Sequence, residues 1–242
     1  MKRYGWLVCL WLLSIVSGVQ ASPLLVASSQ WPGYTEADGQ GLYFEVLRQA
    51  LRSQGVEFKV QVSNWKRARF AFDQQRADVL VCDYASEHAN GVYPKWYLDM
   101  DPAVFVFTRQ PMPSLQQLKG QSVGWVLGYK FAHLVPSEIQ LVEVNSHADG
   151  FRLLQGGRLT AVVSYQQHVP ADWQGPIFKT QVQAPRPLYP VFQNTVSGRE
   201  LARLFDQGMQ QLQQQGRLQA LYPPDVWQRS GLATFDPSSV DR

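Results

Sequence analysis

The apolar residues of the chain follow two different spacings between residues 23 and 97. Short apolar runs with the length and composition of β-strands lie at 23–29, 57–62 and 77–84. Between these runs, residues 42–55 carry apolar side chains along one helical stripe, and a second helical stripe begins behind Asn64, a favourable amino-terminal cap. The pattern predicts a β-α-β-α-β succession, which is typical of a mostly parallel sheet.

A second set of elements follows after residue 101. The predicted strands are 102–107, 121–128, 139–144 and 159–165, with a helix over 147–158. The longest predicted helix, 198–216, begins behind Ser197 and ends at Gly216. Crossings near residues 105 and 188 would make one lobe from 22–107 plus 188–242 and the other from 108–187. The expected fold class is therefore α/β, with two lobes, mostly parallel sheets and a cleft between the lobes.

The amino terminus has the pattern of a secretory signal peptide over residues 1–21: a basic start, a short apolar run and a small-residue ending. We therefore expect a soluble periplasmic protein. Loss of this segment removes Cys9 and leaves Cys82 alone, so no intrachain disulfide is expected, and Cys82 is interpreted as a small buried hydrophobe. Loss of Lys2 and Arg3 takes Lys+Arg from 22 to 20 against 19 Asp+Glu, a net charge of +1. No block of basic residues indicates a nucleic-acid partner.

Five segments, in order, carry a resemblance to a known family. They are "GLYFEVLRQAL", "NWKRARFAFDQQRADVLVC", "LKGQSVGWVLGYKF", "GFRLLQGGRLTAVVSY" and "QQQGRLQALYP". Together they resemble family 3 periplasmic solute-binding proteins over nearly all of the chain after residue 21. The branch that looks most similar begins its second helix with Trp-x-Arg-Ala, here Trp65 to Ala68. The resemblance implies the type II periplasmic binding fold, in which two lobes close on a small solute.

The sequence departs from this family at both contacts that usually hold a free amino acid. The family's Thr-x-x-Arg, whose arginine grips a carboxylate, corresponds here to residues 85–88, which end in His88. The usual aspartate for the ammonium group, in or after the last strand of the second lobe, is replaced by Thr160 or Ser164. Ordinary amino-acid specificity is therefore not expected.

Arg67 is the strongest candidate for ligand contact. Trp65, Ala68 and Phe72 share the apolar face of the predicted helix, and Arg69 has Asp73 one turn later as a surface partner. Arg67 has no acid at a neighbouring helical spacing. It therefore either holds a carboxylate or other anion together with the helix-terminal amides, or pairs with a distant acid such as Glu36, Asp38 or Asp83.

Other candidates come from the loops that should lie beyond the carboxyl ends of the strands, where ligands bind in such sheets. Each has an alternative structural role: loop packing, an internal ion pair or an exposed position. In the second lobe, two residues between a strand and a helix could present backbone amides to an anion. The full candidate set is Arg67, Trp31, Tyr34, Asp83, Tyr84, His88, Gly128 and Tyr129.

Three functions remain in view. The resemblance implies a solute-binding protein for an ABC-type importer, here for a small polar, carboxylate-bearing molecule, with a membrane permease as partner and no cofactor. A ligand-sensing partner of a membrane receptor needs the same cleft. An enzyme with dehydratase-like chemistry would use Asp83, Glu87 and His88 as acid and base, but no nucleophile-base-orienter set is visible. The four histidines lack tight metal-binding spacing, and a monomer is expected.

Overall fold

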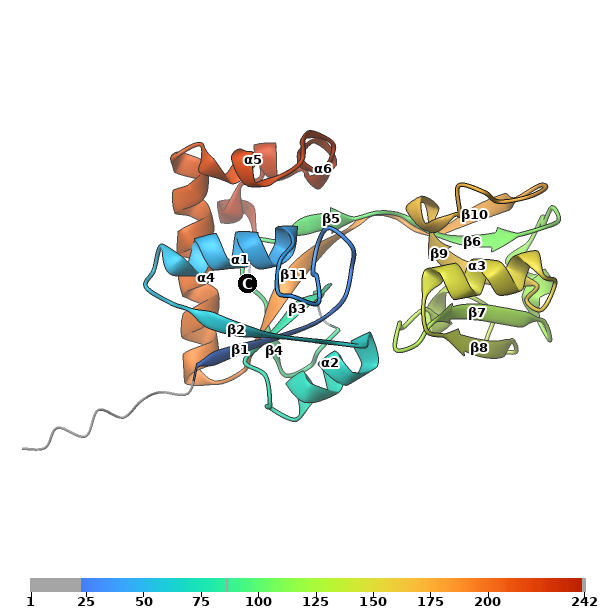
Figure 1. The fold of residues 1–242 in the computed structure, drawn as a ribbon, viewed down its shortest axis with the longest axis horizontal. Coiled ribbons are helices and arrows are strands. Elements are labelled where there is room, and N and C mark those ends of the chain that lie inside the picture. Colours follow the sequence, from blue (N-terminus) through green and yellow to red (C-terminus); the bar gives the residue numbers. More distant parts are fainter. Residues whose placement is uncertain (1–22, 86, 241–242) are drawn as a thin grey trace, which may run out of the picture.

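The computed structural model describes residues 23–85 and 87–240. The signal peptide expected over residues 1–21, including Cys9, lies outside the described residues, as does Ser86. Two bodies, each built around one sheet, are joined by two extended crossings (Figure 1). The expected α/β fold with two lobes is therefore confirmed.

The first sheet has the order β2-β1-β3-β11-β4, with β5 on another part of β11. Strands β1 (Leu24–Ser29), β2 (Phe58–Ser63) and β3 (Val79–Tyr84) are parallel, as the β-α-β-α-β pattern predicts. Strand β11 (Arg186–Gln193) returns from the other body and pairs antiparallel with β3, β4 (Gly91–Val92) and β5 (Asp99–Asp101). The sheet is thus mixed rather than mostly parallel, because its last long strand arrives by a crossing and not through a crossover helix.

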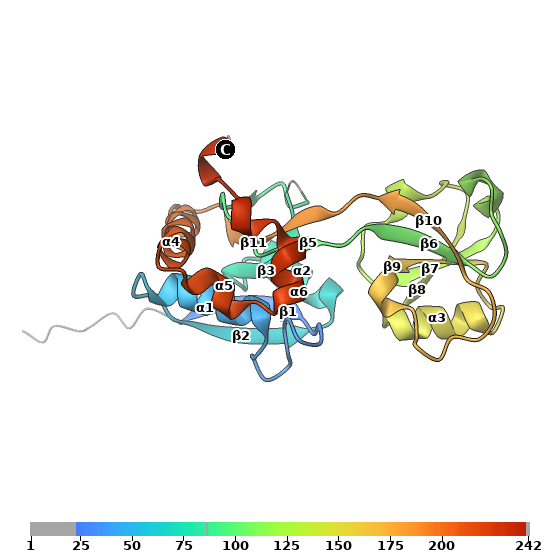
Figure 2. The same ribbon diagram turned by 90° about the horizontal axis from the view of Figure 1, so that it is seen from above.

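Helices cover both faces of this sheet. Helix α1 (Leu42–Arg52) and helix α4 (Val196–Gln214) pack on one face, where Phe44, Leu47 and Phe205 are fully buried. Gly208 of α4 lies so close to α1 that a Cβ there would stand 2.0 Å from the Ala50 carbonyl oxygen. The carboxyl-terminal helices α5 (Arg217–Leu221) and α6 (Pro224–Ser230) continue over the same body (Figure 2). These carboxyl-terminal helices therefore belong to the first body.

Helix α2 (Trp65–Asp73) covers the opposite face. The Asn64 side chain accepts a hydrogen bond from the Arg67 amide at 2.8 Å, so the predicted cap is confirmed. Trp65, Ala68 and Phe72 are buried against that face of the sheet, as their spacing predicts. This packing fixes the amino terminus of α2 beside the carboxyl ends of β1 and β3.

The second sheet has the order β10-β6-β9-β7-β8. Strands β7 (Ser122–Val126), β8 (Gln140–Val144) and β9 (Ala161–Tyr165) are parallel, and β6 (Val104–Thr108) and β10 (Phe178–Gln183) add antiparallel pairs. Helix α3 (His147–Gln155) packs on one face through Phe151 and Leu154. The other connections are short 3₁₀ turns: Leu115–Leu118, Ala132–Leu134 and Gln166–His168 in this body, and Leu232–Thr234 and Pro237–Ser239 after α6.

Several sequence-based expectations differ from the structure. Thr195, not Ser197, caps α4, and its hydroxyl accepts from the Gly198 amide at 3.0 Å. Strand β10 has no counterpart in the predicted elements, since four of its six residues are exposed and carry little apolar signal. Strand β11 tolerates Pro190 because the pairing register with β3 shifts between Tyr189 and Pro190.

From the sheet to which each strand belongs, we propose that the lobe boundaries lie in the crossings at 102–103 and 184–185, close to the expected ones.

Cys82 is a free, buried thiol on β3, and burial raises its pKa well above the usual value. Its interpretation as a small core residue is confirmed.

Across the two described ranges, none of the helices is both long enough and apolar enough to cross a lipid bilayer.

Candidate functional site

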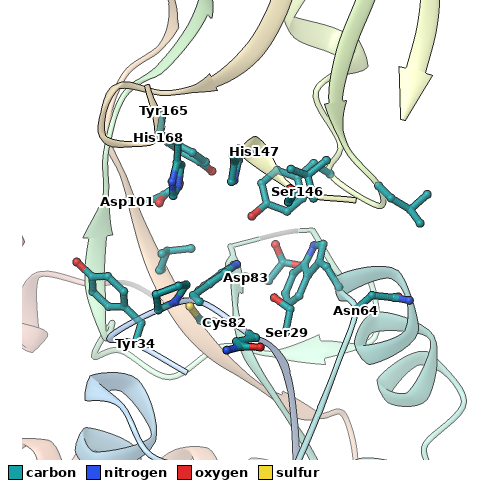
Figure 3. A pocket seen from close by; sticks show the side chains of 18 of the residues that line it. Ser29, Tyr34, Asn64, Cys82, Asp83, Asp101, Ser146, His147, Tyr165 and His168 are labelled. Carbon is teal, nitrogen blue, oxygen red and sulfur yellow. The ribbon is translucent and has the colours of Figure 1, made fainter. Parts of the chain in front are cut away.

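A cavity of about 820 Å³ lies between the two bodies. The first body supplies the carboxyl ends of β1 and β3, the loop after β1 and the start of α2. The second body supplies the loop after β7, the start of α3 and the end of β9. Figure 3 shows side chains from the two bodies facing one another across this space. The cavity therefore lies beyond the carboxyl ends of parallel strands in both sheets, where α/β folds bind ligands.

Five of the eight residues proposed from the sequence line the cavity: Trp31, Tyr34, Asp83, Tyr84 and Tyr129. The loop that carries Trp31 and Tyr34 is fixed by its own backbone, since the Trp31 and Thr35 amides each donate to the other residue's carbonyl oxygen at 2.9 Å. Trp31 stacks at a tilt on Trp65, with ring centroids 5.8 Å apart. The loop backbone thus holds these two aromatic side chains at the cavity wall.

Arg67 does not line the cavity. The structure places it on the exposed surface of α2, while Arg69, two residues further on, lines the cavity instead. Arg69 pairs with Asp83 at 2.6 Å and not with Asp73, so the expected surface pair is wrong. The end of β3 lies closer to Arg69 than the next helical turn does, and helical spacing alone cannot indicate this tertiary contact.

His88 is also outside the cavity lining. It is buried inside the first body, where Nδ1 lies 3.0 Å from Asp73 Oδ1 and Nε2 lies 2.8 Å from Asp83 Oδ2. Both expected roles, ligand contact and exposed loop position, are therefore replaced by a bridge between two carboxylates. This bridge and Arg69 hold the carboxylate of Asp83 at the end of β3.

Gly128 lies where the two bodies meet. It has a positive φ of 88°, and a Cβ there would stand 3.1 Å from the Lys66 backbone nitrogen. Its amide donates to Glu143 at 3.3 Å, and the Tyr129 amide donates to the Val126 carbonyl oxygen at 3.0 Å. The expected anion site on these amides is therefore not formed, because both have acceptors within the second body.

The loop after β7 contacts the first body directly. Lys130 Nζ pairs with Glu87 Oε2 at 2.9 Å and donates to the Glu87 carbonyl oxygen at 2.8 Å. The Tyr129 side chain also packs against the apolar cluster of the first body that includes Trp65. Burial raises the pKa of that phenol. These contacts join the two bodies beside α2.

Asp101, the last residue of β5, lies beside the crossing with two tyrosines from different bodies. Tyr84 of β3 donates to the Asp101 carboxylate, and the hydroxyl of Tyr165 from β9 lies 3.1 Å from the Tyr84 hydroxyl. Burial raises the pKa of Asp101 to about 6, although hydrogen bonding to tyrosine lowers it. The Arg186 guanidinium lies 3.6 Å from the Tyr84 ring centroid.

Two histidines of the second body stack face to face beside Tyr165. His147 and His168 have ring centroids 4.0 Å apart and an interplanar angle of 6°. Burial, with a smaller effect of His168, lowers the pKa of His147 to about 3, and burial also lowers the pKa of His168. Both rings are therefore neutral near pH 7. His147 Nδ1 lies 2.8 Å from the hydroxyl of Ser164, one of the two residues at the family's aspartate position.

Sequence reasoning missed Arg69, Asp101, His147, Tyr165 and His168 as cavity-lining residues. Tyr165 could have been found, because it ends a strand of the second sheet, just as Tyr84 ends a strand of the first. Of the others, Arg69 and His147 lie on helices, Asp101 ends a three-residue strand, and His168 lies in a 3₁₀ turn. The spacing of apolar residues in these segments does not indicate that these polar side chains face a cavity. Within the described part of the chain, no group of three or more histidine, cysteine, aspartate or glutamate side chains is placed to hold a metal ion.

Searches against protein-family descriptions and curated proteins return no match. Many solved structures are similar. The ligand-binding core of GluR0 from Nostoc punctiforme, in complex with L-glutamate, has a TM-score of 0.67 and 18% identity over 83% of this chain and 97% of that one. A histidine kinase sensor domain with similarity to periplasmic binding proteins has a TM-score of 0.65 and 18% identity over 82% of this chain and 93% of that one. The amino acid ABC transporter substrate-binding protein AbpA from Streptococcus pneumoniae, bound to L-arginine, has a TM-score of 0.63 and 16% identity over 86% of this chain and 95% of that one. The chain thus has the two-lobed fold of periplasmic binding proteins.

Proposed function

We propose that the protein is a periplasmic solute-binding protein that captures a small polar molecule between its lobes for an ABC-type importer. The observation that carries this proposal is the cavity of about 820 Å³, which is lined from both lobes and is large enough for a small metabolite. The similar structures support it, because they include transporter substrate-binding proteins. The proposed partners are one solute and a membrane permease, and the protein acts as a monomer.

A sensing role is the second candidate. It is favoured by the similarity to a histidine kinase sensor domain and to the GluR0 ligand-binding core. Capture and sensing need the same closure of two lobes on a ligand, so they differ only in the membrane partner. Copurification of the tagged protein from detergent-solubilised membranes, with solute added, would separate them: an importer subunit supports transport and a receptor supports sensing.

An enzymatic role has less support. The three residues that could serve as acid and base are engaged elsewhere: Asp83 with Arg69, Glu87 with Lys130, and His88 between two carboxylates. A general acid or base must reach the substrate proton it transfers. Incubation of the protein with prephenate-like acids should therefore yield no dehydration product.

Native mass spectrometry of protein freshly purified from its own periplasm tests the proposed capture. We expect a mass increment of one small molecule per monomer that is lost on unfolding. Small-angle scattering should then show a smaller radius of gyration with the solute than after its removal by dialysis from denaturant and refolding. No retained mass from any extract, together with an unchanged radius, would contradict capture.

Trp31→Ala should reduce solute affinity about a hundredfold, or about 2.7 kcal/mol. The indole lines the cavity and stacks at a tilt on Trp65, so the variant loses a ligand contact and part of the aromatic wall. Calorimetric titration with the recovered solute measures the loss. Trp31→Phe should be intermediate, because it keeps a ring but not the N–H group. Trp227→Ala, which removes an indole on α6 outside the cavity, should retain the affinity of the wild type.

A further inference from the structure

Aromatic rings line both sides of the cavity. The first lobe contributes Trp31, Trp65, Tyr34 and Tyr43, with neighbouring ring centroids between 4.8 and 6.2 Å apart. The second lobe contributes a facing group, in which Tyr129 lies 5.6 Å from His147 and Tyr165 lies 5.8 Å from His168. Aromatic faces on opposite walls favour a flat ligand that stacks between them.

The charged side chains around the cavity balance one another inside the protein. The Arg69 guanidinium pairs with Asp83 at 2.6 Å and the Lys130 ammonium with Glu87 at 2.9 Å. Arg229 of α6 pairs with the buried Asp99 at 2.9 Å. The remaining charges are Asp101, which accepts a hydrogen bond from Tyr84, and Arg186, whose guanidinium lies on the Tyr84 ring and attracts Asp101 electrostatically. A charged ligand group would therefore compete with these internal contacts, which costs free energy in a buried site.

The stacked imidazoles add no charge. His147 and His168 are neutral near pH 7, for the reasons given above, and their rings form part of the cavity wall. A neutral imidazole offers one N–H donor and one nitrogen acceptor. This wall can therefore hydrogen-bond to an uncharged polar ring as well as stack against it.

Two buried polar atoms in the cavity lining have no hydrogen-bond partner within the described residues. They are the Ser29 hydroxyl, at the carboxyl end of β1, and the Arg186 Nε at the start of β11. Ser29 is only 6% exposed. Leaving a buried hydroxyl without a partner is costly, so its position on the cavity wall indicates a ligand atom that completes its hydrogen bonding.

We propose that the solute is an uncharged, planar ring compound with hydrogen-bonding groups at its rim, such as a heteroaromatic amide or a nucleobase-like ring. This rests on the proposed function and specifies the class of its ligand. The rings of the two lobes sandwich the compound, and Ser29 and Arg186 hydrogen-bond to its edge. The class differs from free amino acids, which need a cation for the carboxylate and an anion for the ammonium group. It replaces the carboxylate-bearing solute expected from Arg67, which lies outside the cavity.

Sets of related ring compounds that carry different charges test the proposal. Nicotinamide, nicotinate and 1-methylnicotinamide carry the same ring with no charge, a negative charge and a positive charge; uracil and orotate form a second set. Binding is measured by calorimetry and by quenching of tryptophan fluorescence, with L-glutamate and L-arginine as amino acid probes. We expect the uncharged member of at least one set to bind at least about tenfold more tightly than its charged partners. The solute recovered by native mass spectrometry should likewise be an uncharged ring compound.

The proposal is overturned if a charged member or an amino acid binds as tightly as the uncharged rings. It is also overturned if the recovered solute is charged at neutral pH or has no ring, or if none of the uncharged rings binds. In these cases the proposed function still holds if a retained solute or an amino acid binds and closes the lobes. The proposed function itself fails only if no molecule from the extract and none of the probes binds the protein.

A pair of adjacent serines tests the hydrogen bond. Ser29→Ala should weaken binding of the best uncharged ring about tenfold without lowering the melting temperature, because the hydroxyl has no partner inside the protein. Ser28→Ala is the matched control: the Ser28 hydroxyl donates to the Val81 carbonyl oxygen and does not line the cavity. It should lower the melting temperature and keep the affinity. Unchanged affinity of the Ser29→Ala variant would overturn the assignment of this contact.

Discussion

Arg69→Ala is expected to lower the free energy of unfolding by about 3–5 kcal/mol. The guanidinium pairs with Asp83, and their side chains are only 12% and 4% exposed. Removal of the cation leaves a buried carboxylate with one imidazole and its neighbour's amide as partners. The cation also lies 5.7 Å from the Trp65 ring centroid, so the variant loses a favourable contact with the aromatic wall.

Urea unfolding of three variants decides whether the pair has this effect. Arg67→Ala removes a guanidinium from the same helix at an exposed position and should change stability by less than about 0.5 kcal/mol. The double variant Arg69→Met/Asp83→Asn should recover much of the loss, because it removes both charges together. An Arg69→Ala variant as stable as Arg67→Ala would show that the pair contributes no stability.

Relative to the wild type, Asp101→Asn should gain about 2 kcal/mol in the free energy of unfolding between pH 4 and pH 7. Burial raises the folded-state pKa of Asp101 to about 6, above the unfolded value. The folded carboxyl therefore holds its proton where the unfolded one has lost it, and its contribution to stability disappears as pH rises through 6. The asparagine variant lacks this effect, so it gains stability relative to the wild type as pH rises.

The comparison must be made between the two proteins at each pH, because another group has the opposite effect. The pKa of His147 is lowered to about 3 in the folded protein, so its contribution to the free energy of unfolding is present above pH 6.5 and is lost as pH falls. Tyr84, Tyr165, Asp99 and Arg186 face or act on Asp101 and are unchanged in the variant. Urea unfolding at several pH values measures the difference. A difference that does not vary with pH would contradict a raised pKa at Asp101.

The fold could be predicted further than the site. Local spacing identified the Asn64 cap and the buried face of α2, because both depend on residues within one or two helical turns. The partner of Arg69 could not be predicted in this way: helical spacing favours Asp73, whereas the tertiary structure brings Asp83 from β3 to it. The strand-end rule placed Trp31, Asp83 and Tyr84 in the cavity, since the rule depends only on topology.

The residues that determine the charge and shape of the cavity depend on how two sheets face each other. Asp101 ends β5 beside a crossing, and the neighbouring hydroxyls of Tyr84 and Tyr165 come from β3 of one lobe and β9 of the other. The stacked His147 and His168 come from two different connections of the second lobe. Periodicity within a segment contains no information about such pairings, so the sequence indicated a cleft but not its neutral, aromatic character.

The two crossings also affect the order in which the protein can fold. All strands of the second sheet lie within residues 104–183, so this lobe is complete once that stretch of chain is available. The first lobe is different, because β3 pairs with β11 and α1 packs on α4. Both partners follow the inserted lobe in the sequence. Contacts between distant parts of a chain form slowly. We therefore expect the inserted lobe to fold first and the amino-terminal lobe to close only after the end of the chain has arrived.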